Sequence, residues 1–556
     1  MASRRDELNA YSFARKRTNA AFLKPLPNGS IESAPKPLKA VVPGIVMSVL
    51  VLVGFGACGI LKPIAPQGWN DVGGNVLVGS KSTTRYVVLN PKGSKEKILH
   101  PVLNLASAKL LVDPQKFQVV QVDEDQLDGK IAHGPALGIP FAPDRMPGTE
   151  DVDKPKTWAV CNRPSSVRGN KPQQAVFVLG GKEKEKFARS QGKLDLHQAL
   201  FVQDPKGDYY LVDNNGVAFK FDVTMGGHVP MSQAAADRAN QVLRTVVFQG
   251  KAPQQVTDEW MKTLITSPIP LYMPTVPGAG GGRKTSAKGD VPDKYSKIGT
   301  VVQDSASGQK YVVTQDDVEE VSDFIANLLT KGPNAAVVNP GGNGRAMDVP
   351  PLASAAITAA PDEAHSGHNK EFMGQLDFEI GGQKPDNPWP KEDVEMANSF
   401  KDGSQTSGLP AGTDDGVTCN FYEGTSRKIP GTAQQYPYGV PTMGAWVGTD
   451  YPAKIPSGAT SYVTPGDGLL YREVKTPKEK PGSGSMFLVT DTGLRYSVPN
   501  NNDGVKAGKG DDEVGLNQAH LGYAGARVPS VLEAWSRLLS SGPSLTMQDA
   551  KQPQAS

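Results

Sequence analysis

A glycine-rich run from Gly278 to Thr285, GAGGGRKT, is the nearest approach in this sequence to a phosphate-binding loop. In a P-loop, a glycine just before the Lys-Thr pair lets backbone N–H groups cradle phosphate while the lysine reaches its far oxygens. Here Arg283 takes the place of that glycine, and prolines rather than a buried strand precede the run. We therefore favour a flexible linker. Nucleotide binding by Gly278, Lys284 and Thr285 is the weaker alternative.

Candidate metal ligands form two small clusters, one of histidine and acidic residues and one of acidic residues alone. These are His365 and His368 with Asp362 and Glu363, and Asp503 with Asp511, Asp512 and Glu513. Ala, Pro and Gly surround the first cluster, which favours a solvated loop over a zinc site. The second is also interpreted as a solvated loop, with weak calcium binding as the alternative. Because no G-x-S-x-G nucleophile elbow occurs either, we expect no catalytic residue, no cofactor and no metal.

Length and charge narrow the class of protein before any element is placed. The chain has 556 residues, with 59 Lys and Arg against 57 Asp and Glu. This length predicts several domains, and a net charge of +2 leaves no surplus of cations for binding nucleic acid. Glycine (60) and proline (46) together make about a fifth of the chain, which predicts a loop-rich fold that can still build a core.

The segment 40–61, AVVPGIVMSVLVLVGFGACGIL, contains 22 residues without a charge. As a helix it would be about 33 Å long, enough for a hydrocarbon core of about 30 Å. Residues 1–39 carry eight basic and three acidic side chains, or +5, which leaves −3 for the rest of the chain. The positive-inside rule then predicts a single-pass protein with a cytoplasmic N-terminus and an extracytoplasmic C-terminal region.

The tail before this segment has the pattern of a basic helix. Ser3 is a candidate cap for a helix whose first turn holds Asp6 and Glu7. Apolar and small residues recur at steps of three or four, beside a run of three basic residues. A helix lying near anionic lipid and a docking helix for a cytoplasmic partner fit this pattern equally well.

An internal repeat is the main feature of the outer region. Four windows of thirteen residues share Val first, Leu ninth and Pro last, and they begin at Val102, Val256, Val321 and Val531. Their first, fifth and ninth residues would line one helical face. A strand pattern precedes each window, at YVVL (86–89), YLVD (210–213), YVVT (311–314) and FLVT (487–490). Each copy is therefore predicted to be a β-hairpin followed by a helix, with chance coincidence of amphipathic segments as the alternative.

The fold class predicted is α+β, with one transmembrane helix followed by an elongated region of four small β-hairpin/helix repeats around a β-rich central core. The domains expected are a cytoplasmic basic tail with a helix (1–39), the transmembrane helix (40–61), repeat 1 (75–115), the first part of the core (116–195), repeat 2 (196–270), a Gly/Pro linker (271–295), repeat 3 (296–334), the second part of the core (335–465), repeat 4 (466–545) and a flexible tail (546–556).

Of the three cysteines, Cys58 lies within the predicted span, and Cys161 and Cys419 fall one in each part of the core. An even pair on the oxidising side of a membrane favours a disulfide. Two free thiols are the alternative.

The N-terminal run Arg4-Arg5-Asp6-Glu7-Leu8-Asn9-Ala10-Tyr11-Ser12-Phe13, followed by Arg15-Lys16-Arg17 and Ala20-Ala21-Phe22, resembles the cytoplasmic signature of EccB. EccB is a membrane subunit of actinobacterial type VII (ESX) secretion systems. The single span, the four repeats and the two distant outer cysteines are similar to its plan, and the resemblance covers nearly the whole chain. Glu7 departs from it, since Gln is more usual there.

This resemblance implies a structural component of the cell membrane, with the lipid bilayer around its helix and self-association within the complex. Its partners would be the EccC ATPase, EccD, EccE and a mycosin protease. Cys161 would pair with Cys419, and the tail would contact cytoplasmic partners through Arg4, Arg5, Asp6, Tyr11, Phe13, Arg15, Arg17 and Phe22. Repeats of this kind are similar to a cell-wall-binding module, so a membrane-anchored protein that binds peptidoglycan is the alternative. ATP hydrolysis, described for some members, is the weaker alternative, because the P-loop pattern is not intact here.

Overall fold

The structure is a computed structural model. It describes residues 3–23, 38–60, 65–91, 93–165, 171–226, 232–287, 291–332, 335–339, 341–351, 389–398, 416–426, 440–476, 479, 483–499 and 515–554. Both candidate metal-ligand clusters, at 362–368 and 503–513, lie outside these residues.

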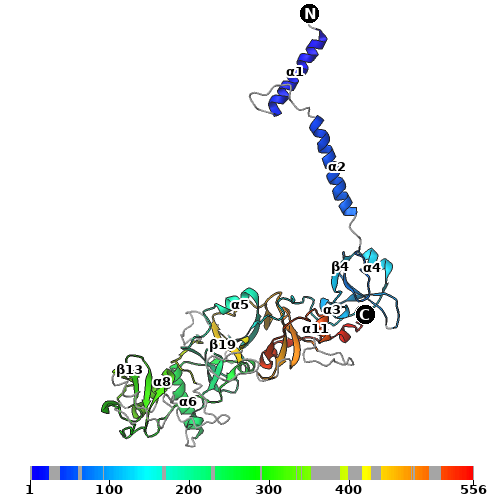
Figure 1. Ribbon diagram of the computed structural model, residues 1–556. Helices are drawn as coiled ribbons and strands as arrows, with labels where there is room; N and C mark the ends of the chain where they lie inside the picture. The colour runs from blue at the N-terminus through cyan, green and yellow to red at the C-terminus, as the bar shows by residue number, and fades with distance from the viewer. Residues whose placement is uncertain are drawn as a thin grey trace.

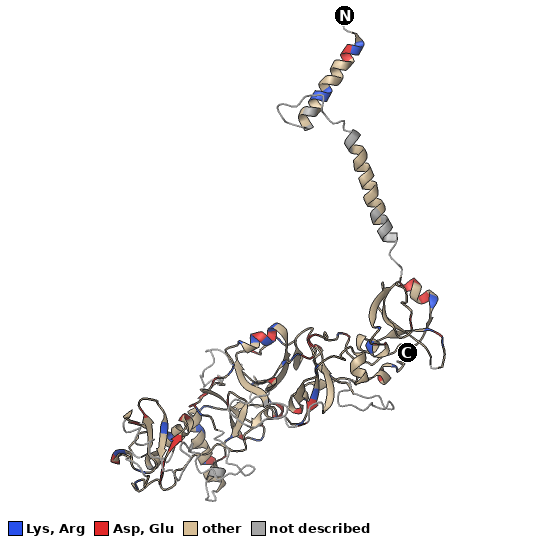
Figure 2. Cartoon of the chain, viewed as in Figure 1, with Lys and Arg blue, Asp and Glu red and all other residues tan. Residues whose placement is uncertain are grey.

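Two helices precede the sheets. In α1 (Arg4–Leu23), the N–H of Arg5 donates to Ser3 Oγ and the N–H of Ser3 donates to Asp6 Oδ2, each at 3.3 Å, which confirms the predicted cap. Helix α2 spans Leu38–Ile60, and in Figure 2 its described part carries neither the blue of Lys and Arg nor the red of Asp and Glu. Within the described residues, no helix is long and apolar enough to cross a membrane. The transmembrane helix expected at 40–61 therefore stays a prediction.

Five β-sheets form the rest of the described chain (Figure 1). Sheet I comprises β1 (Asn75–Gly79), β2 (Arg85–Leu89), β3 (Ile98–Val102), β4 (Gln118–Val122) and β5 (Ala132–His133). Sheet II comprises β8 (Gln198–Gln203), β9 (Tyr209–Val212), β10 (Val217–Lys220), β11 (Gln254–Gln255) and β12 (Ile265–Thr266), with β17 (Glu395–Met396) added beside β8. Sheet III comprises β13 (Val301–Asp304), β14 (Lys310–Val313), β15 (Val318–Val321) and β16 (Met347–Val349).

Sheet IV comprises β21 (Leu469–Val474), β22 (Ser485–Val489), β23 (Leu494–Ser497), β24 (Ser530–Leu532) and β25 (Ser540–Ser541). The central sheet has the order β19-β18-β6-β7-β20 and comprises β6 (Thr157–Arg163), β7 (Gln173–Leu179), β18 (Val417–Ser426), β19 (Val440–Gly448) and β20 (Ser461–Val463). It is built from two distant parts of the chain.

Sheets I to IV share one topology. Three antiparallel strands come first, and a later strand then pairs in parallel with the first of them: β4 with β1, β11 with β8, β16 with β13 and β24 with β21. In sheets I, II and IV a further strand pairs in parallel with the third. The four strand patterns found in the sequence form all or part of the middle strand each time: β2, β9, β14 and β22. This shared order supports four copies of one unit, which stays a prediction.

Helices make the connections within these sheets. Those between the third strand and the first outer strand are α3 (Leu105–Leu111), α6 (Gln233–Phe248), α8 (Asp323–Lys331) with α9 (Ala335–Val338), and α11 (Leu516–His520). Those between the two outer strands are α4 (Glu124–Lys130), α7 (Asp258–Met261) and α12 (Glu533–Ser536). Short helices also occur as α5 (Gly181–Ala188), α13 (Met547–Ala550), η2 (Val223–Gly226) and η3 (Asp293–Tyr295).

The thirteen-residue windows do not mark the same helix of each unit, so that part of the prediction is wrong. The windows at Val102 and Val321 contain α3 and α8, which follow the third strand. Those at Val256 and Val531 contain α7 and α12, which follow the outer strand. The match arose because the first and fifth residues of every window are buried, whichever helix the window contains. The unit is also larger than a hairpin and a helix, since it has outer parallel strands.

Three expected boundaries also differ from the structure. Strands β4 and β5 belong to sheet I, although 116–195 was assigned to the core. The segment 271–295 is not a free linker, because Leu271 and Tyr272 are buried. The tail expected to be flexible at 546–556 contains α13, whose Ala550 is buried, and Gln554 Nε2 donates to the carbonyl of Gly138 at 2.7 Å. The anchors of the tail were concealed in the sequence because Ala550 is small and Gln554 is polar.

The sheets follow one another in a row that differs from their order in the chain (Figure 1). Sheet I, marked by β4, lies nearest α2; sheet IV, the central sheet, sheet II and sheet III then follow, with β13 at the far end. Hydrophobic clusters join neighbours in this row: sheet I to IV, sheets IV and II to the central sheet, and sheet II to III. We call sheets II and IV the inner sheets and sheets I and III the outer sheets.

Candidate functional site

The central sheet uses its two faces differently. Side chains alternate along β6: Trp158 and Val160 face the inner sheets, whereas Ala159 and Cys161 enter a separate cluster on the other face. Both inner sheets therefore dock on one face of the central sheet.

A tryptophan from each inner sheet packs on that face. Trp260 of α7 and Trp535 of α12 occupy equivalent places in sheets II and IV, and both are fully buried in one cluster. The Trp535 ring stacks on Tyr422 of β18 with centroids 5.8 Å apart. Helix α7 is fixed locally by Thr257, whose side chain accepts from the N–H of Trp260. The short helices thus serve to position two large aromatic rings.

Buried amides join sheet II to the central sheet. Asn162 of β6 accepts from the N–H of Thr257 at 3.1 Å, and its carbonyl accepts from Gln254 Nε2 at 3.2 Å. On β18, Asn420 Nδ2 donates to Thr263 Oγ1 at 3.0 Å. Because unpaired buried amides are costly, these pairings fix how sheet II sits on the central sheet.

Sheet IV carries a different polar cluster beside its tryptophan. Tyr471 Oη and Ser536 Oγ lie 2.7 Å apart, and Arg495 Nη1 donates to Ser536 Oγ at 2.8 Å and to Glu473 Oε2 at 2.5 Å. Burial raises the pKa of Tyr471 well above its ordinary value, so the phenol stays neutral. One direct polar contact between sheet IV and the central sheet runs from Tyr422 Oη to the carbonyl of Ser530, at 3.2 Å.

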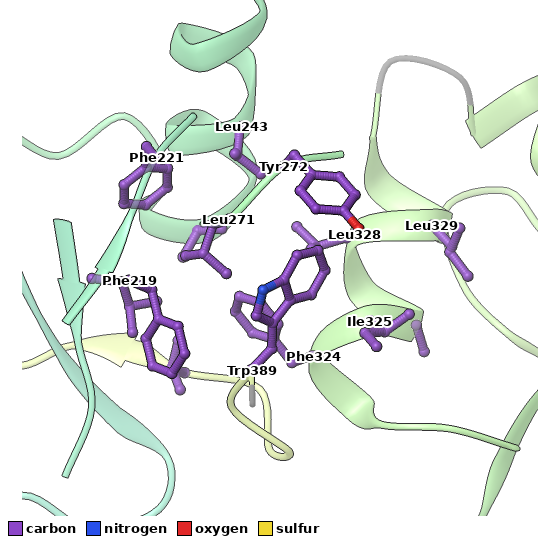
Figure 3. Close-up of a cluster of buried hydrophobic side chains, with 14 of the residues drawn as sticks. Phe219, Phe221, Leu243, Leu271, Tyr272, Phe324, Ile325, Leu328, Leu329 and Trp389 are labelled. Carbon is purple, nitrogen blue, oxygen red and sulfur yellow. The ribbon is translucent and has the colours of Figure 1, made fainter. Parts of the chain in front are cut away.

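Each inner sheet also packs on an outer one. Between sheets I and IV, the Lys109 ammonium donates to the carbonyl of Leu521 at 3.1 Å and lies over the rings of Phe117 and Tyr523. Burial lowers the pKa of Lys109. Between sheets II and III, Trp389 packs edge-on against Tyr272 and Phe324 (Figure 3). Trp389 therefore acts as a wedge supplied by a third segment of the chain.

The structure brings Cys161 and Cys419 together as a disulfide across β6 and β18, which confirms the predicted bridge. The two residues are 258 positions apart in the sequence, and both are fully buried. The bridge joins the two parts of the chain that build the central sheet.

The glycine-rich run does not form a strand–loop–helix phosphate site. From Gly278 to Thr285 the chain makes turns, and no helix begins directly after Thr285. Lys284 Nζ lies 2.5 Å from a carboxylate oxygen of Asp293, on the surface, and the N–H of Thr285 donates to the carbonyl of Ser296 at 2.8 Å. Those groups are thus already engaged in holding this segment to sheet III.

The predicted partner-contacting residues all lie on α1 and are exposed: Arg4, Arg5, Asp6, Tyr11, Phe13, Arg15, Arg17 and Phe22. Phe22 is 91% and Tyr11 72% accessible, unusually high for aromatic side chains. As for metals, no group of three or more His, Cys, Asp or Glu side chains within the described ranges is arranged to hold an ion.

Sequence reasoning missed Trp389 and the buried amides. The amides had a signal, because each outer cysteine is followed by asparagine, giving Cys161-Asn162 and Cys419-Asn420. On adjacent strands this places one disulfide and two amides on opposite faces of the sheet. Trp389 sits in the polar, proline-rich run DNPWP, which carries no periodic pattern.

Residues 1–555 match the family model described as "Type VII secretion system ESX-1, transport TM domain B". The "ESX-3 secretion system ATPase EccB3" of Mycobacterium tuberculosis (strain ATCC 25618 / H37Rv) is 25% identical over 540 residues, covering 92% of this chain and 83% of that protein. The protein of the same name from Mycolicibacterium smegmatis (strain ATCC 700084 / mc(2)155) is 26% identical over 534 residues, covering 92% and 84%.

Two solved structures have a similar fold. A chain of the intact ESX-5 inner membrane complex superposes with a TM-score of 0.51 at 19% identity, covering 100% of this chain and 96% of that one. A chain of the periplasmic assembly from the ESX-5 inner membrane complex gives 0.50 at 19% identity, covering 88% and 98%. With a family model that matches the chain from its first residue to its penultimate one, the protein belongs to the EccB family of type VII secretion system components.

Proposed function

We propose that this chain is a structural membrane component of a type VII (ESX-like) secretion complex, and that its sheets form an outer, extracytoplasmic part of the machine. The observation that carries this proposal is the row of five sheets joined by continuous hydrophobic clusters. Such a row is a stiff spacer, because neighbouring sheets share cores instead of flexible linkers.

The proposal places α2 and its flanks in the bilayer. In support, 40–61 carries no charge, and the tail before it has a net charge of +5. The N-terminus would then be cytoplasmic, and the Cys161–Cys419 bridge would lie on the oxidising side.

Helix α1 is proposed to contact the cytoplasmic parts of other subunits, for which the EccC ATPase, EccD and EccE are the candidates, with a mycosin protease outside. Its exposed aromatic and basic side chains support this role. Detergent extraction at native expression tests the proposal as a whole. We expect the chain to be recovered in a large assembly with other membrane subunits, and recovery as a stable lone monomer would contradict it.

Two other functions have specific observations in their favour. The names of the EccB relatives include the word ATPase, so turnover should be measured in wild type and in Lys284→Ala. Unchanged turnover would remove the glycine-rich run as its site. The repeated units favour cell-wall binding, which a pull-down of the full-length chain with purified wall tests. No enrichment over a control membrane protein would remove that role.

A further inference from the structure

A cavity of about 590 Å³ lies where sheets II and III meet. The last turns of α6 and α8 line it, together with the segment 393–395 and His197. Val247 and Val394 contribute apolar wall from the cluster that Figure 3 shows in part. This volume falls within the range of small-molecule sites, of about 300–1,000 Å³.

One side of the cavity presents hydrogen-bond acceptors. Asn327 Nδ2 donates to Asp393 Oδ1. Because an ionised carboxylate only accepts, this contact fixes the orientation of the Asn327 amide. The Asp393 and Glu395 carboxylates line the same cavity, so this side calls for a ligand that donates N–H groups and carries positive charge.

The other charged group is a cation. Lys331 is the last residue of α8, it lines the cavity, and its side chain is exposed. Its ammonium can meet a carboxylate on the same ligand. A purely cationic ligand would be repelled by Lys331. A purely anionic ligand would be repelled by the two carboxylates.

We propose that this cavity binds a small zwitterion. The ligand's ammonium group meets the Asp393 and Glu395 carboxylates, and its carboxylate meets Lys331. A free amino acid and a short peptide with both termini charged share this chemistry. Because two carboxylates face one lysine, blocking the ligand's ammonium should weaken binding more than blocking its carboxylate.

The test is a calorimetric titration of the full-length chain in detergent with dialanine, alanine, N-acetyl-dialanine and dialanine amide. We expect saturable binding of a free zwitterion, with the acetylated peptide weaker by at least about tenfold and the amide weakened less. Tighter binding of alanine would identify a free amino acid as the ligand, and tighter binding of dialanine a peptide. The absence of saturation by either up to about 10 mM would overturn the proposal.

Two variants and a control locate the site. Asp393→Asn should weaken zwitterion binding by about tenfold. Lys331→Met should abolish the difference between dialanine and its amide while leaving thermal stability unchanged. Lys297→Met removes another exposed lysine near sheet III, away from the cavity, and should bind as wild type does. Equal binding by wild type and both cavity variants would overturn the assignment, and Lys331→Met keeps the test valid if Asp393→Asn fails to fold.

Discussion

The inner and outer sheets share a topology but use different parts of it to make contacts. In the inner sheets the short helix between the outer strands carries a tryptophan against the central sheet, Trp260 in one and Trp535 in the other. The same helix of sheet I carries Leu127, which stays within a small cluster of its own sheet. The outer sheets instead present α3 and α8 to their inner neighbours. The same unit thus docks in two ways. The inner sheets, which pack on the central sheet, have a tryptophan where sheet I has the smaller Leu127.

The largest expected effect on stability comes from removing the disulfide of the central sheet, on which both inner sheets pack. Replacing both partners, Cys161→Ala with Cys419→Ala, should destabilise the central sheet by about 5 kcal/mol in the chain-entropy account of a 258-residue loop. Hydrogen exchange of β6 and β18 amides measures this. Cys58→Ala serves as the control and should leave exchange unchanged. Equal protection of these amides in wild type and in the double cysteine variant would show that the disulfide does not hold the two parts of the sheet together.

Removing a docking tryptophan should have the next largest effect. Trp260→Ala and Trp535→Ala should each cost about 4 kcal/mol, because each leaves a large cavity against the central sheet. Exchange should rise in the central sheet and in the inner sheet that carries the substitution. Leu127→Ala is the matched change in sheet I, and its effect should stay within sheet I. A rise confined to one sheet for the tryptophan variants would contradict shared docking.

The two inner sheets should also differ in their response to pH. In the turn between β9 and β10, burial raises the pKa of Asp213 to about 6, whereas Thr490 occupies the equivalent turn of sheet IV. Because the folded pKa lies above the unfolded value of about 3.9, the protonated form is favoured in the folded state. The contribution of Asp213 to folded-state stability is fully present below about pH 4 and is lost as the pH rises through 6.

Asp213→Asn removes that titration. It should stabilise sheet II by about 3 kcal/mol at pH 7.5 and have little effect at pH 4, since one pKa unit corresponds to about 1.4 kcal/mol. Exchange of β9 and β10 amides at the two pH values measures the difference, with β22 and β23 as the internal reference. Equal protection of these amides in Asp213→Asn and in wild type at pH 7.5 would show that burial does not destabilise the ionised Asp213 carboxylate.

The smallest effect on stability is expected outside the sheets. Tyr11→Ala and Phe22→Ala should change stability by less than about 0.5 kcal/mol, because both side chains are exposed. They should nevertheless reduce the recovery of other subunits with the extracted chain. Asn9→Ala, on the opposite side of α1 from Tyr11, should not. Recovery that is unchanged by all three would contradict a docking role for α1.

The features that could be predicted from the sequence are those that local patterns determine. The middle strands of sheets I to IV, the α1 cap and the disulfide were all accessible, because each depends on a short run of residues or on compartment. The pairing of sheet I with IV and of sheet II with III was not accessible. It depends on contacts such as Lys109 with Leu521, whose partners are more than 400 positions apart. Trp389 was missed because a wedge in an irregular segment has no period to detect.

Native mass measurement of the complex extracted from its own membrane, with every subunit identified, tests the central claim most directly. The account predicts that this chain is recovered in a large assembly with other type VII secretion membrane subunits. Recovery of the chain alone, at the mass of one 59.0 kDa polypeptide with its bound detergent, would contradict a structural role in the secretion machine.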